Sequence, residues 1–250
     1  MPLKTEIITF IEAKVDSANQ EDFYRKPLVG FSSASDPLYA SLKEVVGSHH
    51  LRPEEVLPEV KTIISFFLPF SKKVVEANRH DPVTPAKEWV DSYWHANNLI
   101  DEISGELVNH IEAKGIKAGM VNSTNNYNSE TLKAPWSHRS AAFVGGLGRF
   151  GLNRMLITPV GGAGRYGTVF ISEELPASPR PVDELCLYFK NGSCRHCLKH
   201  CPPKALGSGP DEFDRYACNR KLLDLTPYTK SLNWDIDVCG KCDVGPCAII

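Results

Sequence analysis

All eight cysteines of this 250-residue chain lie between Cys186 and Cys247. The first ten residues lack the basic and then apolar pattern of a signal peptide, so we expect a soluble cytoplasmic protein. Thiols stay reduced in that compartment, which argues against disulfides and in favour of metal binding. The last part of the chain is therefore expected to bind metal.

The spacing of these cysteines narrows the kind of metal centre. Bacterial ferredoxins with two clusters carry the run C-x2-C-x2-C-x3-C-P, in which three cysteines bind one cluster and the fourth binds the other. Here Cys194-x2-Cys197-x3-Cys201-Pro supplies the last three positions. The first position falls on Asn191, a poor iron ligand, and Cys186 can replace it if the segment between them loops out. The spacing thus favours iron–sulfur clusters.

The same crossing rule assigns the remaining cysteines. Three closely spaced thiolates can hold one face of a cluster, whereas the cysteine before proline is directed to the opposite side. We therefore expect two [4Fe–4S] clusters, one on Cys186, Cys194, Cys197 and Cys247, and the other on Cys201, Cys218, Cys239 and Cys242. Clusters held in this way lie on the order of 10 Å apart, close enough for fast electron exchange. The sequence predicts an electron-transfer module.

Zinc and disulfides are the alternatives for these eight thiols. Eight cysteines could fill two four-thiolate zinc sites, and Cys239-Gly-Lys-Cys242 alone has the spacing of a zinc knuckle. Zinc ribbons, however, carry paired C-x2-C units, and the compact run that ends at Cys201 is not such a unit.

Composition excludes several other classes. A net charge of −2 gives no basic surface for nucleic acid and no polybasic patch for a membrane. The longest apolar stretch, 63–70, is interrupted by Ser65 and Pro69 and is too short to span a bilayer. Prolines 176, 179 and 181 mark a boundary, so we expect an α/β domain over 1–180 and a cysteine-rich domain over 181–250.

Hydrophobic periodicity predicts the elements of the first domain. Helices are expected over 3–15 and 99–111, strands over 60–70, 117–121, 155–158 and 167–172, and a loop over 72–87. Gly115 is the expected end of the second helix. Because helices and strands alternate, these residues predict one layered α/β domain.

With the cysteine run, two further motifs carry a resemblance to a known family. Residues 137–153 read SHRSAAFVGGLGRFGLN, and an apolar segment ending in Thr158-Pro159 and the segment 167–172 follow. This order resembles the epoxyqueuosine reductase family of cobalamin-dependent iron–sulfur proteins, whose relatives include reductive dehalogenases. The resemblance covers about residues 55–250 and all eight cysteines in order.

The resemblance implies a nitroreductase-like, corrinoid-binding α/β domain followed by a dicluster ferredoxin-like domain. A base-off cobalamin would lie between them, and a small ferredoxin or flavodoxin would supply electrons. The residues it implies at the cofactor are Tyr93, His95, Asn122, His138, Arg139, Gly146, Gly148, Gly151 and Asn153. The alternatives are a surface histidine for His95, a cap or ion pair for His138 and Arg139, and a tight turn for the glycines.

This chain departs from the family at three points. The family aspartate that is thought to donate a proton corresponds to Asn122, and an amide cannot supply a proton at neutral pH. The lysine of the family's Gly-Lys-Asn is Leu152 here. The chain ends three residues after Cys247, without the helical repeats that help those enzymes hold tRNA, so tRNA modification is not expected and the small-molecule substrate is unknown.

Two other functions remain open. One is a cobalamin-free, ferredoxin-like electron-transfer protein whose first domain docks a partner. The other is a flavin- or nicotinamide-dependent oxidoreductase that uses the G-x-G-x-x-G run at 146–151, with Glu173 or Glu174 about 20 residues on. The polar run 122–128 could present amides to a ligand or form a turn. His196 and His200, beside the cysteines, are expected to be solvated or to bond to sulfur.

Overall fold

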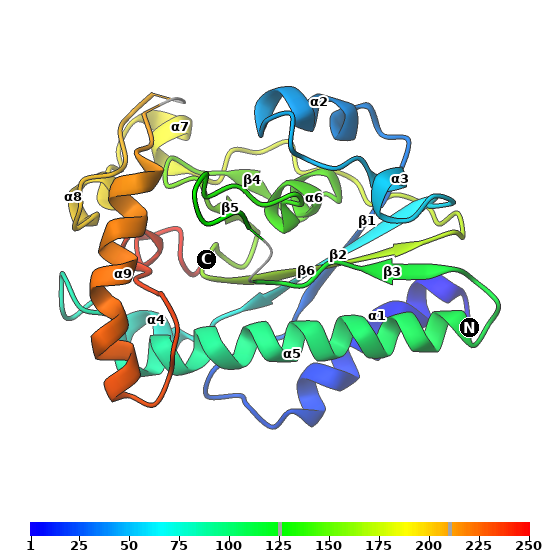
Figure 1. Ribbon diagram of the computed structural model, residues 1–250, viewed down its shortest axis with the longest axis horizontal. Coiled ribbons are helices and arrows are strands. Elements are labelled where there is room, and N and C mark those ends of the chain that lie inside the picture. The colour runs from blue at the N-terminus through cyan, green and yellow to red at the C-terminus, as the bar shows by residue number, and fades with distance from the viewer. Residues whose placement is uncertain (125–126, 210–211) are drawn as a thin grey trace.

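A four-stranded antiparallel sheet in the order β1-β2-β6-β3 lies at the centre of the protein (Figure 1). The computed structural model describes residues 1–124, 127–209 and 212–250. The strands are β1 Leu28–Ser33, β2 Thr62–Pro69, β3 Ala118–Met120, β4 Arg149–Phe150, β5 Leu156–Ile157 and β6 Gly164–Ile171. The helices are α1 Leu3–Ser17, α2 Pro37–Val45, α3 Pro53–Val56, α4 Lys72–Ala77, α5 Lys87–Glu112, α6 His138–Val144, α7 Leu187–Asn191, α8 His196–His200 and α9 Arg215–Ser231, and η1 Lys241–Asp243 is a short 3₁₀ helix.

Both faces of the sheet are covered, which gives a mixed α/β fold. Helix α5 packs against β6 and β3 with α1 beside it, and α6 packs against β2 and β6 on the other face (Figure 1). The central strand β2 is buried along its whole length, which explains its nearly continuous apolar sequence. The register pairs Ile64 of β2 with Phe31 of β1 and Val169 of β6.

Helix α5 is much longer than the apolar stripe predicted. The stripe over 99–111 lies within it as expected, but the helix begins at Lys87. Trp89, Val90 and Ala96 extend the buried face toward the N-terminus. Gly115, at φ +78°, follows the end of the helix in the left-handed region that glycine adopts easily.

The loop predicted over 72–87 is wrong for its first part, where α4 forms. Ser71 caps this helix through its hydroxyl oxygen, which accepts a hydrogen bond from the amide of Val74. Val74 and Val75 are fully buried against the core. The sequence pattern did not predict this short helix, because its two lysines are exposed and only two valines are buried.

The cysteine-rich segment packs against the sheet layer. Helices α7, α8 and α9 lie at one end of the molecule, and the C-terminal residues return toward the start of β6 (Figure 1). The amide of Gly162 donates to the carbonyl of Cys247, and Val238, Val244 and Ala248 join the same apolar core as α5. Residues on both sides of position 180 therefore share one core. Within the described ranges, no helix is long and apolar enough to cross a membrane.

Candidate functional site

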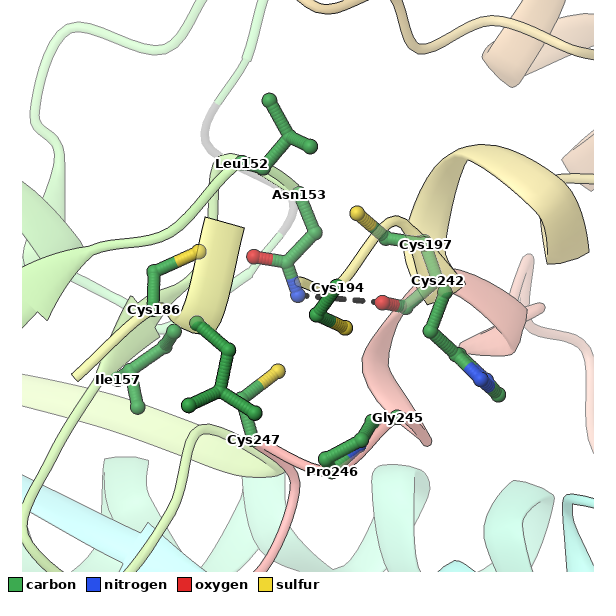
Figure 2. Close-up of a pocket in the computed structure, with 12 residues that line it drawn as sticks. Leu152, Asn153, Ile157, Cys186, Cys194, Cys197, Cys242, Gly245, Pro246 and Cys247 are labelled. Carbon is green, nitrogen blue, oxygen red and sulfur yellow. Dashed lines mark hydrogen bonds between the residues drawn. The ribbon is translucent and has the colours of Figure 1, made fainter. Parts of the chain in front are cut away.

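Five cysteines line one cavity, and four of them, from three segments of the chain, form a first group beside Cys242 (Figure 2). This first cysteine group consists of Cys186, Cys194, Cys197 and Cys247. Cys186 caps the start of α7, Cys194 and Cys197 flank the start of α8, and Cys247 lies near the C-terminus. Apolar side chains, Leu152 and Ile157 among them, form part of the wall.

The thiols of this group lie close enough to interact electrostatically. Burial raises the pKa of Cys197 to about 11, with Cys186 and Cys194 adding to the shift, and burial raises that of Cys247 to about 12, with Asp243 and the other three thiols adding to it. Left without a metal, these thiols would stay protonated at neutral pH, whereas a bound metal stabilises the thiolate. The group has the composition of a cluster-binding site.

The second cysteine group consists of Cys201, Cys218, Cys239 and Cys242. Burial raises the pKa of Cys218 to about 11, and its neighbours Cys201 and Cys239 contribute to the shift. The thiol of Cys242 interacts with all three of the others. Electrostatic contacts thus link Cys242 to the other three members of its set, while Cys242 also lines the cavity of the first group, and the assignment of the cysteines to two clusters stays a prediction. Over the described part of the chain, no three His, Cys, Asp or Glu side chains are spaced to ligate a single metal ion.

Residues just after α4 hold the last cysteine loop in place. The side-chain amide of Asn78 donates to the carbonyl of Cys239 (3.2 Å). The guanidinium of Arg79 donates to the carbonyls of Val244 (2.7 Å) and Gly245 (3.3 Å). Neither residue is predicted from the sequence, since a polar pair at the end of a short helix carries no local signal for contacts about 160 positions away.

Asn153 links the glycine-rich loop to the same segment. Its amide nitrogen donates to the carbonyl of Cys242 (3.1 Å) and to Oδ1 of Asp243 (3.3 Å), as Figure 2 shows for the first of these. Its Oδ1 accepts from the amide of Met155 (3.1 Å). Asn153 also lines the cavity of the first cysteine group, beside Leu152. Asn153 is therefore a buried residue that joins the glycine-rich loop to the segment carrying Cys242.

Two polar side chains approach the cysteine groups without belonging to them. The Nε2 atom of His196 is buried with no hydrogen-bond partner among the described residues, and His196 lines the first group's cavity. Its ring stacks on that of His200, with centroids 3.8 Å apart. Lys241, between Cys239 and Cys242 in the chain, is almost fully buried.

A larger pair of cavities lies between the sheet and the second cysteine group. The first, about 380 Å³, is lined by residues that include Trp136, His138 and Arg139, and we call it the cationic cavity. The second, about 200 Å³, includes Tyr93, and Cys239 and Cys242 form part of its wall. The two share Met155, Gly164 and Arg165, so they adjoin each other at the start of β6.

The glycines of the loop after α6 meet the chain itself. A Cβ atom on Gly148 would lie 2.1 Å from the carbonyl oxygen of Ile157, and one on Gly146 would lie 2.5 Å from that of Pro179. At Gly151 it would approach the side chain of Ile157 to 2.6 Å. The loop also runs from α6 into β4, whereas a dinucleotide-binding loop runs from a strand into a helix. Close backbone packing accounts for these glycines.

The other residues that the sequence analysis singled out lie at different distances from the cavities. Tyr93 and Arg165 form a cation–π pair at 4.5 Å. His95 stacks on Phe23 (5.7 Å) and meets Trp234 edge-on (5.5 Å), away from the residues that line the cavities.

Asn122, which the resemblance aligns with the family aspartate, accepts a hydrogen bond from a buried histidine. The Nε2 atom of His138 lies 3.0 Å from the backbone oxygen of Asn122, whose residue is exposed. The polar run continues through residues 125 and 126, which lie outside the described residues.

No protein-family model and no curated protein matches this chain. Solved structures do match. An epoxyqueuosine reductase from Bacillus subtilis aligns over 97% of this chain and 66% of its own, at 19% identity and a TM-score of 0.56. A second structure, of an epoxyqueuosine reductase with a tRNA-Tyr stem loop, aligns over the same shares at 19% identity and a TM-score of 0.59.

A reductive dehalogenase, described with a mechanism for B12-dependent dehalogenation, is also similar. It aligns over 73% of this chain and 24% of its own, at 18% identity and a TM-score of 0.52. At identities this low, the similarity shows only that the fold is shared. The chain therefore has the fold of epoxyqueuosine reductases and reductive dehalogenases, as the resemblance predicted, and spans 66% of the length of the epoxyqueuosine reductases compared.

Proposed function

We propose that this protein is an iron–sulfur reductase in which each cysteine group binds a [4Fe–4S] cluster and the clusters deliver electrons to a cobalamin in the adjoining cavities. The observation that carries the proposal is that the thiols of Cys242 and Cys247 each interact with three other cysteines, which are those that the crossing rule of dicluster ferredoxins places with them. The proposed protein is cytoplasmic and has a nitroreductase-like domain over 1–180 and a ferredoxin-like domain over 181–250. A small ferredoxin or flavodoxin would reduce it.

The surroundings of the thiols fit iron–sulfur clusters. Thiolate sulfurs in such sites accept hydrogen bonds from N–H groups, which tune the reduction potential. The amide of Ala205 already donates to the sulfur of Cys201 (3.3 Å). The unpartnered Nε2 of His196 borders the first group, where a cluster would offer it a sulfur acceptor.

The pair of cavities fits a flat, amide-bearing cofactor. Tyr93 and Trp136 supply aromatic surface, and Arg139 and Arg165 supply hydrogen-bond donors. A group held there would contact the wall that Cys239 and Cys242 form, which makes the electron path short. When bound, cobalamin supplies a strongly reducing, nucleophilic cobalt centre that no side chain can provide.

The chain's own residues control protons at this site. A backbone carbonyl only accepts hydrogen bonds, so Nε2 of His138 carries the proton that it donates to Asn122. Its Nδ1 then accepts from the hydroxyl of Thr168 (2.8 Å). Burial lowers the pKa of His138 to about 4, so the ring is neutral at pH 7. Neither this neutral imidazole nor the amide of Asn122 is a ready acid, so the reaction we propose draws its proton from another source.

Iron analysis of anaerobically reconstituted protein tests the clusters. We expect about eight iron atoms per chain and a broad violet absorption shoulder, as two cubanes require. Cys194→Ser and Cys218→Ser should each retain about four. The double variant Cys194→Ser/Cys197→Ser should lose no more than Cys194→Ser, whereas Cys194→Ser/Cys218→Ser should lose both clusters. Colourless protein loaded with zinc would overturn the proposal.

Cobalamin binding is tested separately. The reconstituted protein is incubated with cobalamin and desalted, and retained corrinoid is read from its absorption. Retention at about one per chain supports the reductase. Clusters without retained cobalamin would leave the ferredoxin-like electron carrier that docks a partner, and would remove the reductase from consideration.

A further inference from the structure

The walls of the cationic cavity carry an unbalanced positive charge. Lys133, Arg139, Arg165 and Arg215 line it together with His49 and His138, and none of its lining residues in the described part of the chain is acidic. These cations come from a loop, from α6, from β6 and from the first residue of α9. In a chain with a net charge of −2, four cations without one carboxylate in a single cavity need an explanation.

The two arginines nearest the sheet are held by neutral groups. Nε of Arg165 donates to Oδ1 of Asn97 (2.8 Å), and its guanidinium lies over the ring of Tyr93. Nη1 of Arg139 donates to the carbonyl of Arg154 (3.0 Å) and contacts the sulfur of Met155. These contacts orient the guanidinium groups through neutral partners, while Asp243, outside the walls of this cavity, acts on both arginines electrostatically.

The cations act on one another through the cavity. Besides burial, Arg165 lowers the pKa of His138, and Lys133 and Arg215 lower that of His49. The nearest acids of the site, Asp237 and Asp243, line the adjoining cavity instead. An anion bound among like charges relieves their repulsion, and guanidinium forks pair with carboxylate and phosphate through two hydrogen bonds.

We propose that the part of the cationic cavity at His49, Lys133 and Arg215, which the proposed cofactor contacts do not use, binds the carboxylate or phosphate of a small organic anion, and that this anion is the substrate reduced beside the cofactor. That the anion is a substrate rests on the proposed function. That an anion binds here rests on the cavity alone. A volume of about 380 Å³ lies within the range of small-molecule pockets. The phosphate of a corrinoid tail has the same chemistry, so the test separates the two sources.

Inorganic phosphate is the probe, titrated calorimetrically into reconstituted protein with and without bound cobalamin. The test variant is Lys133→Gln/Arg215→Gln, which removes two cations outside the cysteine groups. The control is Lys61→Gln/Arg220→Gln, which removes two exposed cations, one of them also on α9. We expect saturable binding in both forms of the protein, weakened about tenfold or more in the test variant and less than about twofold in the control.

Each other outcome has a definite meaning. Phosphate binding that disappears when cobalamin is loaded would assign the cations to the corrinoid tail and overturn the substrate assignment. No saturable binding, or equal weakening in the control, would overturn the anion site itself. Preferential binding of an RNA hairpin, lost in the test variant, would replace the small anion with a nucleic acid. If cobalamin is never retained while phosphate binds as expected, the reductase fails and the anion site stands.

Discussion

The ammonium nitrogen of Lys241 lies 2.8 Å from both the backbone oxygen and the side-chain Oδ1 of Asn78. Asn78 in turn donates to the carbonyl of Cys239. Burial lowers the pKa of Lys241, while the neighbouring thiol of Cys239 acts in the opposite direction. A buried ammonium needs such partners, so this pair fixes a cation beside the second cysteine group.

Replacing Lys241 with methionine should lower the reduction potential of the second cluster. A reduced cluster carries one more negative charge, so a nearby cation stabilises it, and Lys241→Met removes that cation at nearly constant length. We expect a shift of roughly 60 mV to more negative potential, the one-electron equivalent of a tenfold change in equilibrium constant. An EPR-monitored redox titration measures it. Lys72→Met, at an exposed lysine of α4, is the control, and equal potentials in all three proteins would refute the role of Lys241.

Asn153 should be required for the fold around both cysteine groups. Asn153→Ala removes hydrogen bonds to Cys242 and Asp243 and should cost about 1–3 kcal/mol of unfolding free energy. Asn153→Asp should cost more, because it places a carboxylate against a carbonyl and Asp243. Urea unfolding and iron retention under a chelator report both effects. Asn98→Asp, at an exposed position of α5, is the control, and equal stability of the Asn153→Asp and Asn153→Ala variants would contradict this account.

Hydrophobic periodicity was enough to predict the apolar stripe of the long helix α5. The stripe that includes Ile103 and Leu107 follows from helical period and is buried as predicted, whereas the division of the cysteines into two groups, which follows from a short run of intervals, stays a prediction. The short helix α4 was missed because its burial depends on just two valines, Val74 and Val75.

The residues that hold the cysteine loops and line the cationic cavity were not predicted, because their contacts join distant parts of the chain. Arg79 contacts Val244, and the cationic cavity joins Lys133 to Arg215, so each depends on pairs far apart in the chain. Such pairs have no periodic signature. For the glycine loop, the motif was visible in the sequence but its role was not, since the motif alone does not reveal that Gly148 faces Ile157.

Acid should destabilise the protein partly through His138. Its pKa is about 4 when folded and near 6.5 when unfolded, so the unfolded chain binds more protons between these values and stability falls as the pH drops. Between pH 7.5 and 5.5 the expected loss from this residue is about 1.3 kcal/mol. His138→Gln should remove this part of the pH dependence, whereas His80→Gln, at an exposed histidine, should keep it. Urea unfolding at the two pH values measures the slope, and an unchanged slope in His138→Gln would exclude His138 as its source.

Alanine substitutions can decide whether the glycine loop serves packing or a ligand. A Cβ on Gly148 meets the backbone oxygen of Ile157, the partner of Arg149 in the β4–β5 pair, so Gly148→Ala should cost about 3 kcal/mol or more. A Cβ on Gly105, within α5, would lie 3.9 Å from the sulfur of Met120, which is an ordinary contact. Gly105→Ala should therefore stabilise the fold by about 0.5–1 kcal/mol, since glycine is costly inside a helix. Unfolding free energies and cobalamin retention are measured on both. If Gly148→Ala were as stable as the unmodified protein but had lost cobalamin, the glycine would serve the approach of a ligand, and packing would not be its reason.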